Sequence, residues 1–178
     1  GARLSEADPV HQHFVFALDR PWHPGERRSF RFVTERCNPG FKNDDNASAV
    51  APNGTFFSNT ASMPVLGFAA DKLLEDRPER RERGLPERPR APKLEDERFH
   101  DVGALKPDSD WVTFTTTVST RPDQVAVATG YLEAEWEEGD RRFFRYAMDA
   151  PIQNFFAYLS ADYTVVEDEH RGVTLQVF

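Results

Sequence analysis

Apolar and polar residues alternate along several short segments of this chain, and turn-forming residues separate the segments. Phe14, Phe16 and Leu18 fall on one face of an extended segment, because side chains two apart share a face of a strand. Residues 154–159 are almost continuously apolar, which is typical of a strand buried on both faces. These patterns predict strands over residues 10–18, 28–36, 55–58, 111–118, 124–129, 131–136, 141–148, 154–159, 162–166 and 172–178.

Residues 71–98 form a charged segment with nine basic and nine acidic residues, so the segment carries no net charge. Asp76 is placed to cap the start of a short helix, Pro78 suits its first turn, and Gly84 suits its end. Three prolines follow and exclude regular structure after the helix. We expect an insertion of helix and loop with interleaved salt bridges rather than a basic binding patch.

Helix is expected only in this charged segment, and the other predicted elements are strands at the spacing typical of β-sandwiches. The sequence therefore predicts an all-β fold: one antiparallel β-sandwich or saddle-like domain over residues 1–178, with the charged insertion at 71–98. The last predicted strand runs to Phe178 without a turn signal, so we expect the chain to be a piece of a longer protein.

Composition excludes several classes of protein. The chain has 15 Phe, 13 Pro and 10 Gly among 178 residues, which favours strands and turns over helices. Its net charge of −8 does not provide the basic surface that nucleic-acid binding needs. A single cysteine excludes an internal disulfide framework and a multi-thiolate zinc site. No apolar run approaches the roughly 18 residues of a membrane span, and no HExxH, GxSxG, CxxC or Gly-rich phosphate loop is present.

His11 and His13 are one candidate for a metal site. Residues two apart on a strand project from the same face, so the two imidazoles could bind one ion. A third ligand would have to come from elsewhere, such as His23 or an acidic residue. The interpretation that we favour is two half-exposed strand histidines without a metal.

A cluster of acidic residues is a candidate for a pair of catalytic carboxylates. Such a pair needs two carboxylates that face each other in a cleft with shifted pKa values. Period-two alternation places Glu133 and Glu135 together on the solvent face, opposite Trp136, so a solvated strand that discourages edge pairing is the favoured interpretation. The cluster consists of Glu133, Glu135, Glu137, Glu138 and Asp140.

The other candidates have ordinary explanations. Asn46 and Asn53 match the glycosylation pattern, which is short and often arises by chance, so we interpret both as turn asparagines. Cys37 has no histidine close in the sequence that could activate it, so a half-buried structural thiol is favoured. The tryptophans could stack on a ligand, but aromatic residues at strand spacing more simply form a core. These tryptophans are Trp22, Trp111 and Trp136.

Residues 125–131 and 144–159 together resemble a known arrangement of alternating strand, hairpin, aromatic strand and closing motif. In aminopeptidase-N-type zinc metallopeptidases, the gluzincins, the N-terminal saddle domain has such strands followed by Thr-x-Pro-Met-Ser-Thr-Tyr-Leu. Residues 149–156 are similar to that motif in a divergent form, and residues 110–123 resemble the strand and turn that lead to it. Residues 53–57 and 79–89 resemble a bacterial branch in which a transporter-permease-like membrane region is joined to an aminopeptidase-like region.

The chain also departs from the family's pattern. The catalytic domain of the family, with HExxH, a distant glutamate ligand and a Gly-x-Met-Glu-Asn loop, would lie beyond Phe178. The saddle domain usually contributes a glutamine to the substrate's amino-terminal pocket, yet residues 55–66 contain only Asn59 near that position. The resemblance therefore assigns no catalytic, cofactor-binding or metal-ligating residue to this chain.

The resemblance implies a non-catalytic β domain in a membrane-associated zinc aminopeptidase. Its partners would be the downstream catalytic domain, which it braces, and the peptide substrate, whose cleft it walls on one side. Zinc would bind in the downstream domain, where it polarises a water and the scissile carbonyl. We expect a soluble domain of a bacterial membrane protein, with no nucleic acid bound and no insertion into the membrane by this segment. The alternative is a β-sandwich interaction or ligand-binding module of a transporter-associated protein that has no peptidase activity.

Overall fold

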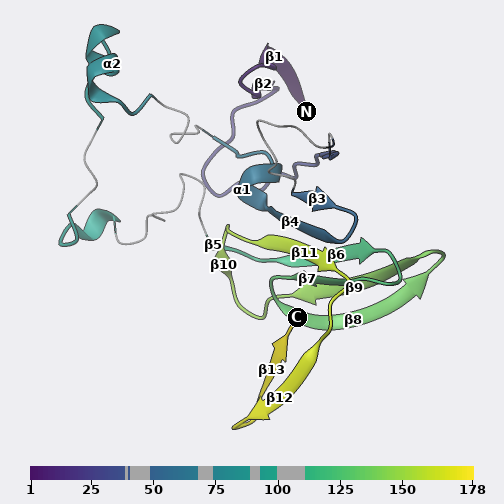
Figure 1. The fold of residues 1–178 in the computed structure, drawn as a ribbon. Helices are drawn as coiled ribbons and strands as arrows, with labels where there is room; N and C mark the ends of the chain where they lie inside the picture. The colour runs from purple at the N-terminus through teal and green to yellow at the C-terminus, as the bar shows by residue number, and fades with distance from the viewer. Residues whose placement is uncertain (39, 41–48, 68–73, 89–92, 100–110) are drawn as a thin grey trace. The chain divides into compact units, whose positions relative to one another are not determined.

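A computed structural model describes residues 1–38, 40, 49–67, 74–88, 93–99 and 111–178 (Figure 1). Of these residues 43% lie in strands and 9% in helices, and the paired strands run antiparallel. The predicted all-β fold class is therefore confirmed. The chain divides into two compact units, Gly1–Val33 and Thr34–Phe178, which are described one at a time.

The first unit contains an antiparallel hairpin of β1 (Ala2–Asp8) and β2 (His13–Leu18). The predicted alternation in β2 is confirmed, because the register places Phe14 and Phe16 on one face and Val15 on the other. The predicted strand at 10–18 is too long, since a turn with Gln12 at φ 54° occupies its beginning.

Two further expectations for the first unit and the segment after it are corrected. Residues 28–36, all of which the structure describes, contain no strand, because β2 pairs with the preceding β1 instead of a following segment. β1 itself was not predicted. An irregularity between Leu4 and Glu6 interrupts its period-two pattern, so the sequence does not display a strand there.

The second unit is built on two main antiparallel sheets (Figure 1). The first has the order β3-β4-β11-β7 and consists of β3 (Val50–Ala51), β4 (Gly54–Ser58), β11 (Ala157–Ala161) and β7 (Val125–Ala128). The second has the order β6-β9-β8 and consists of β6 (Thr115–Thr120), β9 (Arg141–Ala147) and β8 (Tyr131–Glu138). Two smaller pairs accompany them, β5 (Trp111–Val112) with β10 (Ile152–Gln153), and β12 (Val166–His170) with β13 (Val173–Val177).

The core of the second unit lies where β9 packs against β7. Phe144 is 1% exposed and Ala126 is 0% exposed, and Tyr146 is buried beside them. The Tyr146 hydroxyl donates a hydrogen bond to the Ala126 carbonyl at 2.8 Å, so the polar end of this core residue has a partner. The two sheets are thus joined by apolar packing and by one buried hydrogen bond.

Several strand boundaries differ from the predicted ones. The strand at 111–118 is interrupted because Phe114 turns into the interior, where its ring lies 4.4 Å from that of Phe156. The strand at 154–159 starts only at Ala157, because the Phe156 N–H before it donates to the Asn59 side chain and not to a neighbouring strand. This strand is half-buried, not buried on both faces as predicted. The final hairpin uses 166–170 instead of 162–166, since its turn lies at Arg171 and Gly172.

The charged insertion contains the predicted helix, α2 (Arg77–Glu82). The Asp76 side chain accepts a hydrogen bond from the Glu79 N–H at 2.9 Å, Pro78 lies in the first turn, and Gly84 follows the helix with φ 65°. Buried Arg80 donates to the carbonyls of Leu74 and Pro86, which ties together the segments before and after α2. A short 3-10 helix, η2 (Glu97–Phe99), comes later in the same segment.

The expectation that helix is confined to the charged segment is wrong. The short helix α1 (Asn59–Ser62) follows β4 in the first sheet. It is a single turn. Its first residue is the buried Asn59, whose side chain is hydrogen-bonded to Asn154 and so fixes the turn to a distant part of the chain.

Candidate functional surfaces

The structure does not place His11 and His13 on one face of a strand. His13 begins β2, whereas His11 lies in the turn before it, and its Nδ1 is 2.7 Å from Asp8 Oδ2. That hydrogen bond, together with one from the His11 backbone N–H, holds the pKa of the Asp8 carboxyl below its usual range. Within the described residues, no group of three or more His, Cys, Asp or Glu side chains is arranged to hold a metal ion.

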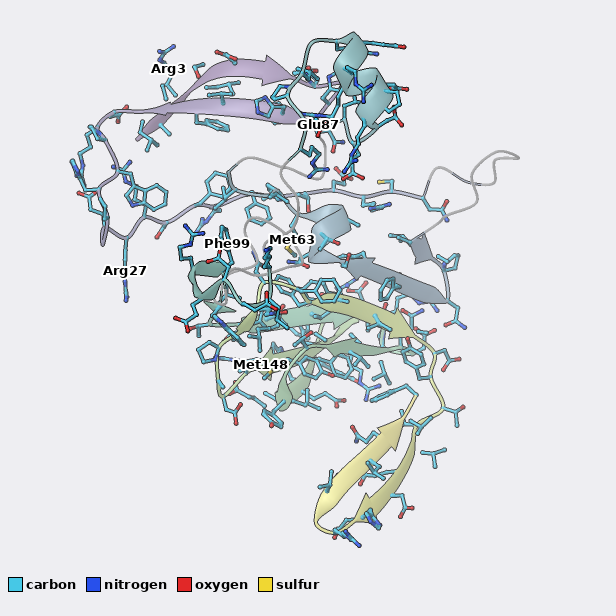
Figure 2. All side chains as sticks on the ribbon, turned by 90° about the vertical axis from the view of Figure 1, so that its left-hand side faces the viewer. Arg3, Arg27, Met63, Glu87, Phe99 and Met148 are labelled. Carbon is cyan, nitrogen blue, oxygen red and sulfur yellow. The ribbon has the colours of Figure 1, made fainter. Side chains whose placement is uncertain are left out.

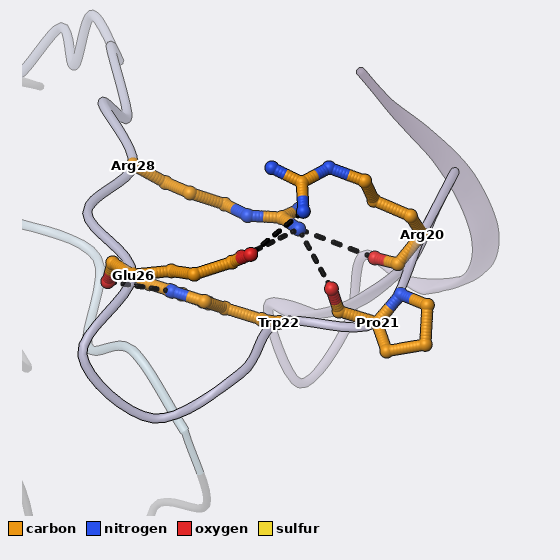
Figure 3. Close-up of polar contacts among 5 residues, drawn as sticks. All are labelled: Arg20, Pro21, Trp22, Glu26 and Arg28. Carbon is orange, nitrogen blue, oxygen red and sulfur yellow. Dashed lines mark hydrogen bonds and ion pairs between the residues drawn. The ribbon is translucent and has the colours of Figure 1, made fainter.

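A polar cluster surrounds Trp22 in the first unit (Figure 3). Arg28 Nη2 donates to the carbonyls of Arg20 and Pro21 at 3.2 and 3.1 Å, and its guanidinium carbon lies 5.5 Å from the centre of the Trp22 ring. The Trp22 Nε1–H donates to the Glu26 carbonyl at 2.9 Å. Arg20 donates to the Glu26 carboxylate and holds its pKa below the usual range. These contacts occupy one ring face and the ring N–H, so we interpret this cluster as the structure of a turn.

The acidic cluster is divided between the two faces of its sheet. β8 has a bulge between Leu132 and Ala134, so Glu133 and Glu135 do not share a face as predicted. Glu135 lies opposite buried Phe144 and forms an ion pair with Arg142 at 2.6 Å. Glu133 pairs with Arg145 on the other face at 3.2 Å. Both side chains are exposed as expected, but the expectation that they share one face is wrong, and the two carboxylates cannot act as a pair.

An aromatic pair lies on the face of the β6-β9-β8 sheet that is turned away from the core. Trp136 is directly opposite Phe143 in the register, and the two rings are stacked 5.2 Å apart at an angle of 8°. Trp136 is 37% exposed. Arg141 crosses the same face and donates to the side chain and carbonyl of Ser119 at 3.0 and 2.5 Å. This surface combines an apolar ring with nearby charged and hydroxyl groups.

The remaining candidates are Cys37, the two asparagines and the tryptophans. Cys37 is exposed, so the expectation of a half-buried thiol is wrong. Its Sγ is 3.7 Å from the Glu35 carboxylate, which is the opposite of the electropositive environment that a reactive thiolate needs. Asn53 lies in the turn between β3 and β4, as expected, and its side chain accepts a hydrogen bond from the N–H of the distant Asp162 at 2.7 Å. Asn46 lies outside the described residues. Trp22, Trp111 and Trp136 are 54%, 69% and 37% exposed, so the expectation that these tryptophans belong to the core is wrong for all three.

Asn59 is a structural residue whose buried amide is fully engaged. Its Nδ2 donates to the carbonyl and side-chain oxygens of Asn154, each at 3.0 Å. Its Oδ1 accepts from the Phe156 N–H at 3.2 Å, and its own N–H donates to the Phe156 carbonyl at 2.9 Å. Asn59, the residue nearest the position of the glutamine in the family that the sequence resembles, therefore connects α1 to the start of β11. No local pattern in the sequence marks this role, because the partners of Asn59 are 95 and 97 residues away.

We expect Asn59→Ala to lower the free energy of unfolding by about 2–4 kcal/mol, because it removes the three side-chain hydrogen bonds that join α1 to the start of β11 and deprives the half-buried Phe156 N–H of its acceptor. Urea denaturation followed by tryptophan fluorescence measures the change. Asn53→Ala removes an exposed turn contact and is the matched control, with an expected loss of about 1 kcal/mol or less. Equal losses in the two variants would contradict the role given to Asn59.

Tyr146 is the titratable group that the core perturbs. Burial raises the pKa of its phenol above the usual 10.0, and the nearby Glu135 carboxylate raises it further. Because the pKa is raised in the folded state, its contribution to stability is complete below about pH 10 and is lost as the pH rises from there towards the folded-state pKa.

We therefore expect the urea midpoint of the native chain to fall more steeply above pH 10 than that of Tyr146→Phe. The variant should also be less stable at neutral pH by about 1–2 kcal/mol, because the buried Ala126 carbonyl loses its donor. Urea titrations between pH 8 and 11.5 measure both effects. The exposed Tyr131→Phe serves as control and should keep the steep alkaline fall. A native-like pH profile for Tyr146→Phe would show that this phenol is not the group responsible.

Comparison with known protein families, with curated proteins and with solved structures finds no match to this chain. Among the residues that the structure describes, no helix is both long and apolar enough to cross a membrane.

Proposed function

We propose that this chain is a non-catalytic β domain that packs against a second folded domain, as the saddle domain does in aminopeptidase-N-type zinc peptidases. The observation that carries the proposal is the apolar face of the hairpin β1–β2. Its register places four large apolar side chains on one face, and all are more than 40% exposed. They are Leu4, Phe14, Phe16 and Leu18.

Soluble proteins seldom leave such a contiguous apolar face in water, and a larger exposed patch usually marks an interaction site. The opposite face of the same hairpin carries polar residues, among them Arg3, Glu6 and His13. This amphipathic pattern suits a surface that is covered on one side only. The sequence resemblance supplies the identity of the partner, a zinc-binding catalytic domain of the same polypeptide, and the all-β fold is compatible with it.

The first test is to read the open reading frame downstream of Phe178. An HExxH motif followed by a more distant glutamate supports the peptidase proposal, and a downstream region without it removes the peptidase from the proposal.

In the full gene product, Phe16→Glu should lower the melting temperature and the kcat/KM for aminoacyl-aminomethylcoumarin. Val15→Glu lies on the opposite face of the same strand and should leave both unchanged. The chain alone, supplied with zinc, should show no turnover.

A second candidate function, a ligand-binding module, is favoured by the Trp136–Phe143 pair. An exposed aromatic ring next to arginine and hydroxyl groups could stack on a sugar ring and hydrogen-bond its edge. Titration with cellohexaose, maltohexaose and chitohexaose should then change the tryptophan fluorescence of the native chain and of Trp111→Phe, but not of Trp136→Phe. No change with any of these sugars would remove this candidate.

A further inference from the structure

The hairpin β12–β13 extends beyond the two main sheets of its unit and forms a separate two-stranded sheet (Figures 1 and 2). Its turn has Arg171 at φ 53° and Gly172 at φ 78°, which is the two-residue type I′ geometry. Such a turn hydrogen-bonds the closing pair, His170 and Val173, and bonded and non-bonded pairs then alternate along the ladder. The N–H and C=O groups of Thr174 and Gln176 therefore point outward from the free edge of β13.

The two free edges of this hairpin differ in their protection. On β12, the outward N–H of Glu169 is already bonded to the Asp168 carboxylate at 2.8 Å. The strand also carries Glu167, so three consecutive acidic residues line it. Charged edge residues and local side-chain bonds are devices that prevent strand pairing. The edge of β12 is thus closed to another strand.

The edge of β13 has none of these devices. Its sequence, Val-Thr-Leu-Gln-Val, has no charge, no proline and no glycine. Val173, Leu175 and Val177 share one face and are about half exposed or more. No described strand pairs with this edge. A two-stranded hairpin is at best marginally stable in water, and a neutral, β-prone edge is a template for a further strand.

We propose that β13 pairs antiparallel with β13 of a second copy of this chain, so that two hairpins form a four-stranded sheet. The outward groups fix the register. Thr174 of one copy lies opposite Gln176 of the other, with two backbone hydrogen bonds at each of these symmetric pairs. Leu175 then lies on the two-fold axis opposite its own copy, and Val173 lies opposite Val177, so both faces match their counterparts.

Charge selects this pairing over the alternatives. Pairing of β12 with its own copy would place Glu167 and Glu169 against like charges, which is destabilising in a sheet. Pairing of β12 with β13 would have to break the bond between Asp168 and the Glu169 N–H. Pairing of β13 with itself brings no charge against another and adds apolar cross-strand contacts at Leu175 and the two valines.

Analytical ultracentrifugation of the chain over a range of micromolar concentrations tests the proposal, with a reversible dimer as the expected result. Thr174→Pro removes an outward N–H that β12 does not use, and should weaken dimerisation roughly tenfold or more, because each dimer loses two hydrogen bonds. Glu169→Pro makes the same change on the opposite edge and should leave the dimer intact. A native chain that stays monomeric, a dimeric Thr174→Pro or a monomeric Glu169→Pro overturns the proposal.

Disulfide trapping tests the register without relying on proline. In a Cys37→Ser background, Leu175→Cys places two thiols opposite each other on the two-fold axis, with Cβ atoms about 5 Å apart. Val173→Cys lies on the same strand and face, but the two copies of that residue would be about 13 Å apart. Mild oxidation should give a covalent dimer with Leu175→Cys and none with Val173→Cys. The reverse result, equal trapping of both variants or no trapping of Leu175→Cys overturns the proposed pairing.

Discussion

Replacing Phe144 with alanine is expected to lower the free energy of unfolding by about 3–5 kcal/mol, the range found for large-to-small changes at buried aromatic positions. Phe144 is 1% exposed and belongs to the core cluster with Ala126 and Tyr146, so the lost side chain leaves a cavity between the two main sheets. Urea denaturation followed by circular dichroism measures the loss.

Phe143→Ala is the matched control, since it deletes the same side chain one position earlier on the opposite face of β9. Phe143 packs on Trp136 at a half-exposed surface, so we expect a loss of only about 1–1.5 kcal/mol. Phe144→Leu, which keeps most of the volume, should cost about 1.5 kcal/mol or less. If Phe143→Ala were as destabilising as Phe144→Ala, the core would not lie on the side of β9 described above.

Gly130→Ala is expected to destabilise the chain by about 3 kcal/mol or more, because the substitution is both strained and sterically blocked. Gly130 has φ +112° and connects β7 of one main sheet to β8 of the other. A Cβ atom at this position would lie 2.8 Å from the Ala147 carbonyl oxygen and 2.9 Å from its carbon. These are backbone atoms of the central strand β9, so relief would require the β8–β9 pairing to shift.

Gly139→Ala separates the two contributions. Gly139 also has a positive φ, +62°, but no atom lies within 4 Å of its would-be Cβ. We expect it to cost only about 1 kcal/mol, the strain of a left-handed residue without a clash. Thermal and urea unfolding of both variants measure the difference. Similar losses would mean that the close approach of Gly130 to Ala147 contributes little to stability.

The charged insertion shows how far local chemistry determines structure. Asp76, Pro78 and Gly84 specify the beginning and end of α2 within a few residues, and the structure has the helix where they predict it. Asn59 shows the opposite case. Its partners are 95 and 97 residues away in the sequence, so no local pattern could indicate that it is buried or that a turn of helix begins there.

The bulge in β8 explains why the sequence predicts the wrong faces for Glu133 and Glu135. Strict alternation puts Glu133 and Glu135 on one face, but one irregular residue pair reverses every side chain beyond it. The bulge brings Glu135 to Arg142 and Glu133 to Arg145, two partners on opposite faces of β9. The bulge belongs to the pairing of β8 with β9, which the sequence of β8 does not display.

The sequence by itself determined the all-β class, several of the turns and the single predicted helix, because alternation, proline, glycine and capping residues act within a few positions of the chain. Only the tertiary structure decided which apolar faces are covered. The Phe144 face is buried by β7, whereas the equally apolar faces of β1–β2 and β13 are exposed. Whether a face is buried depends on which other element of the fold packs against it. Period-two alternation shows only that one face of the strand is apolar.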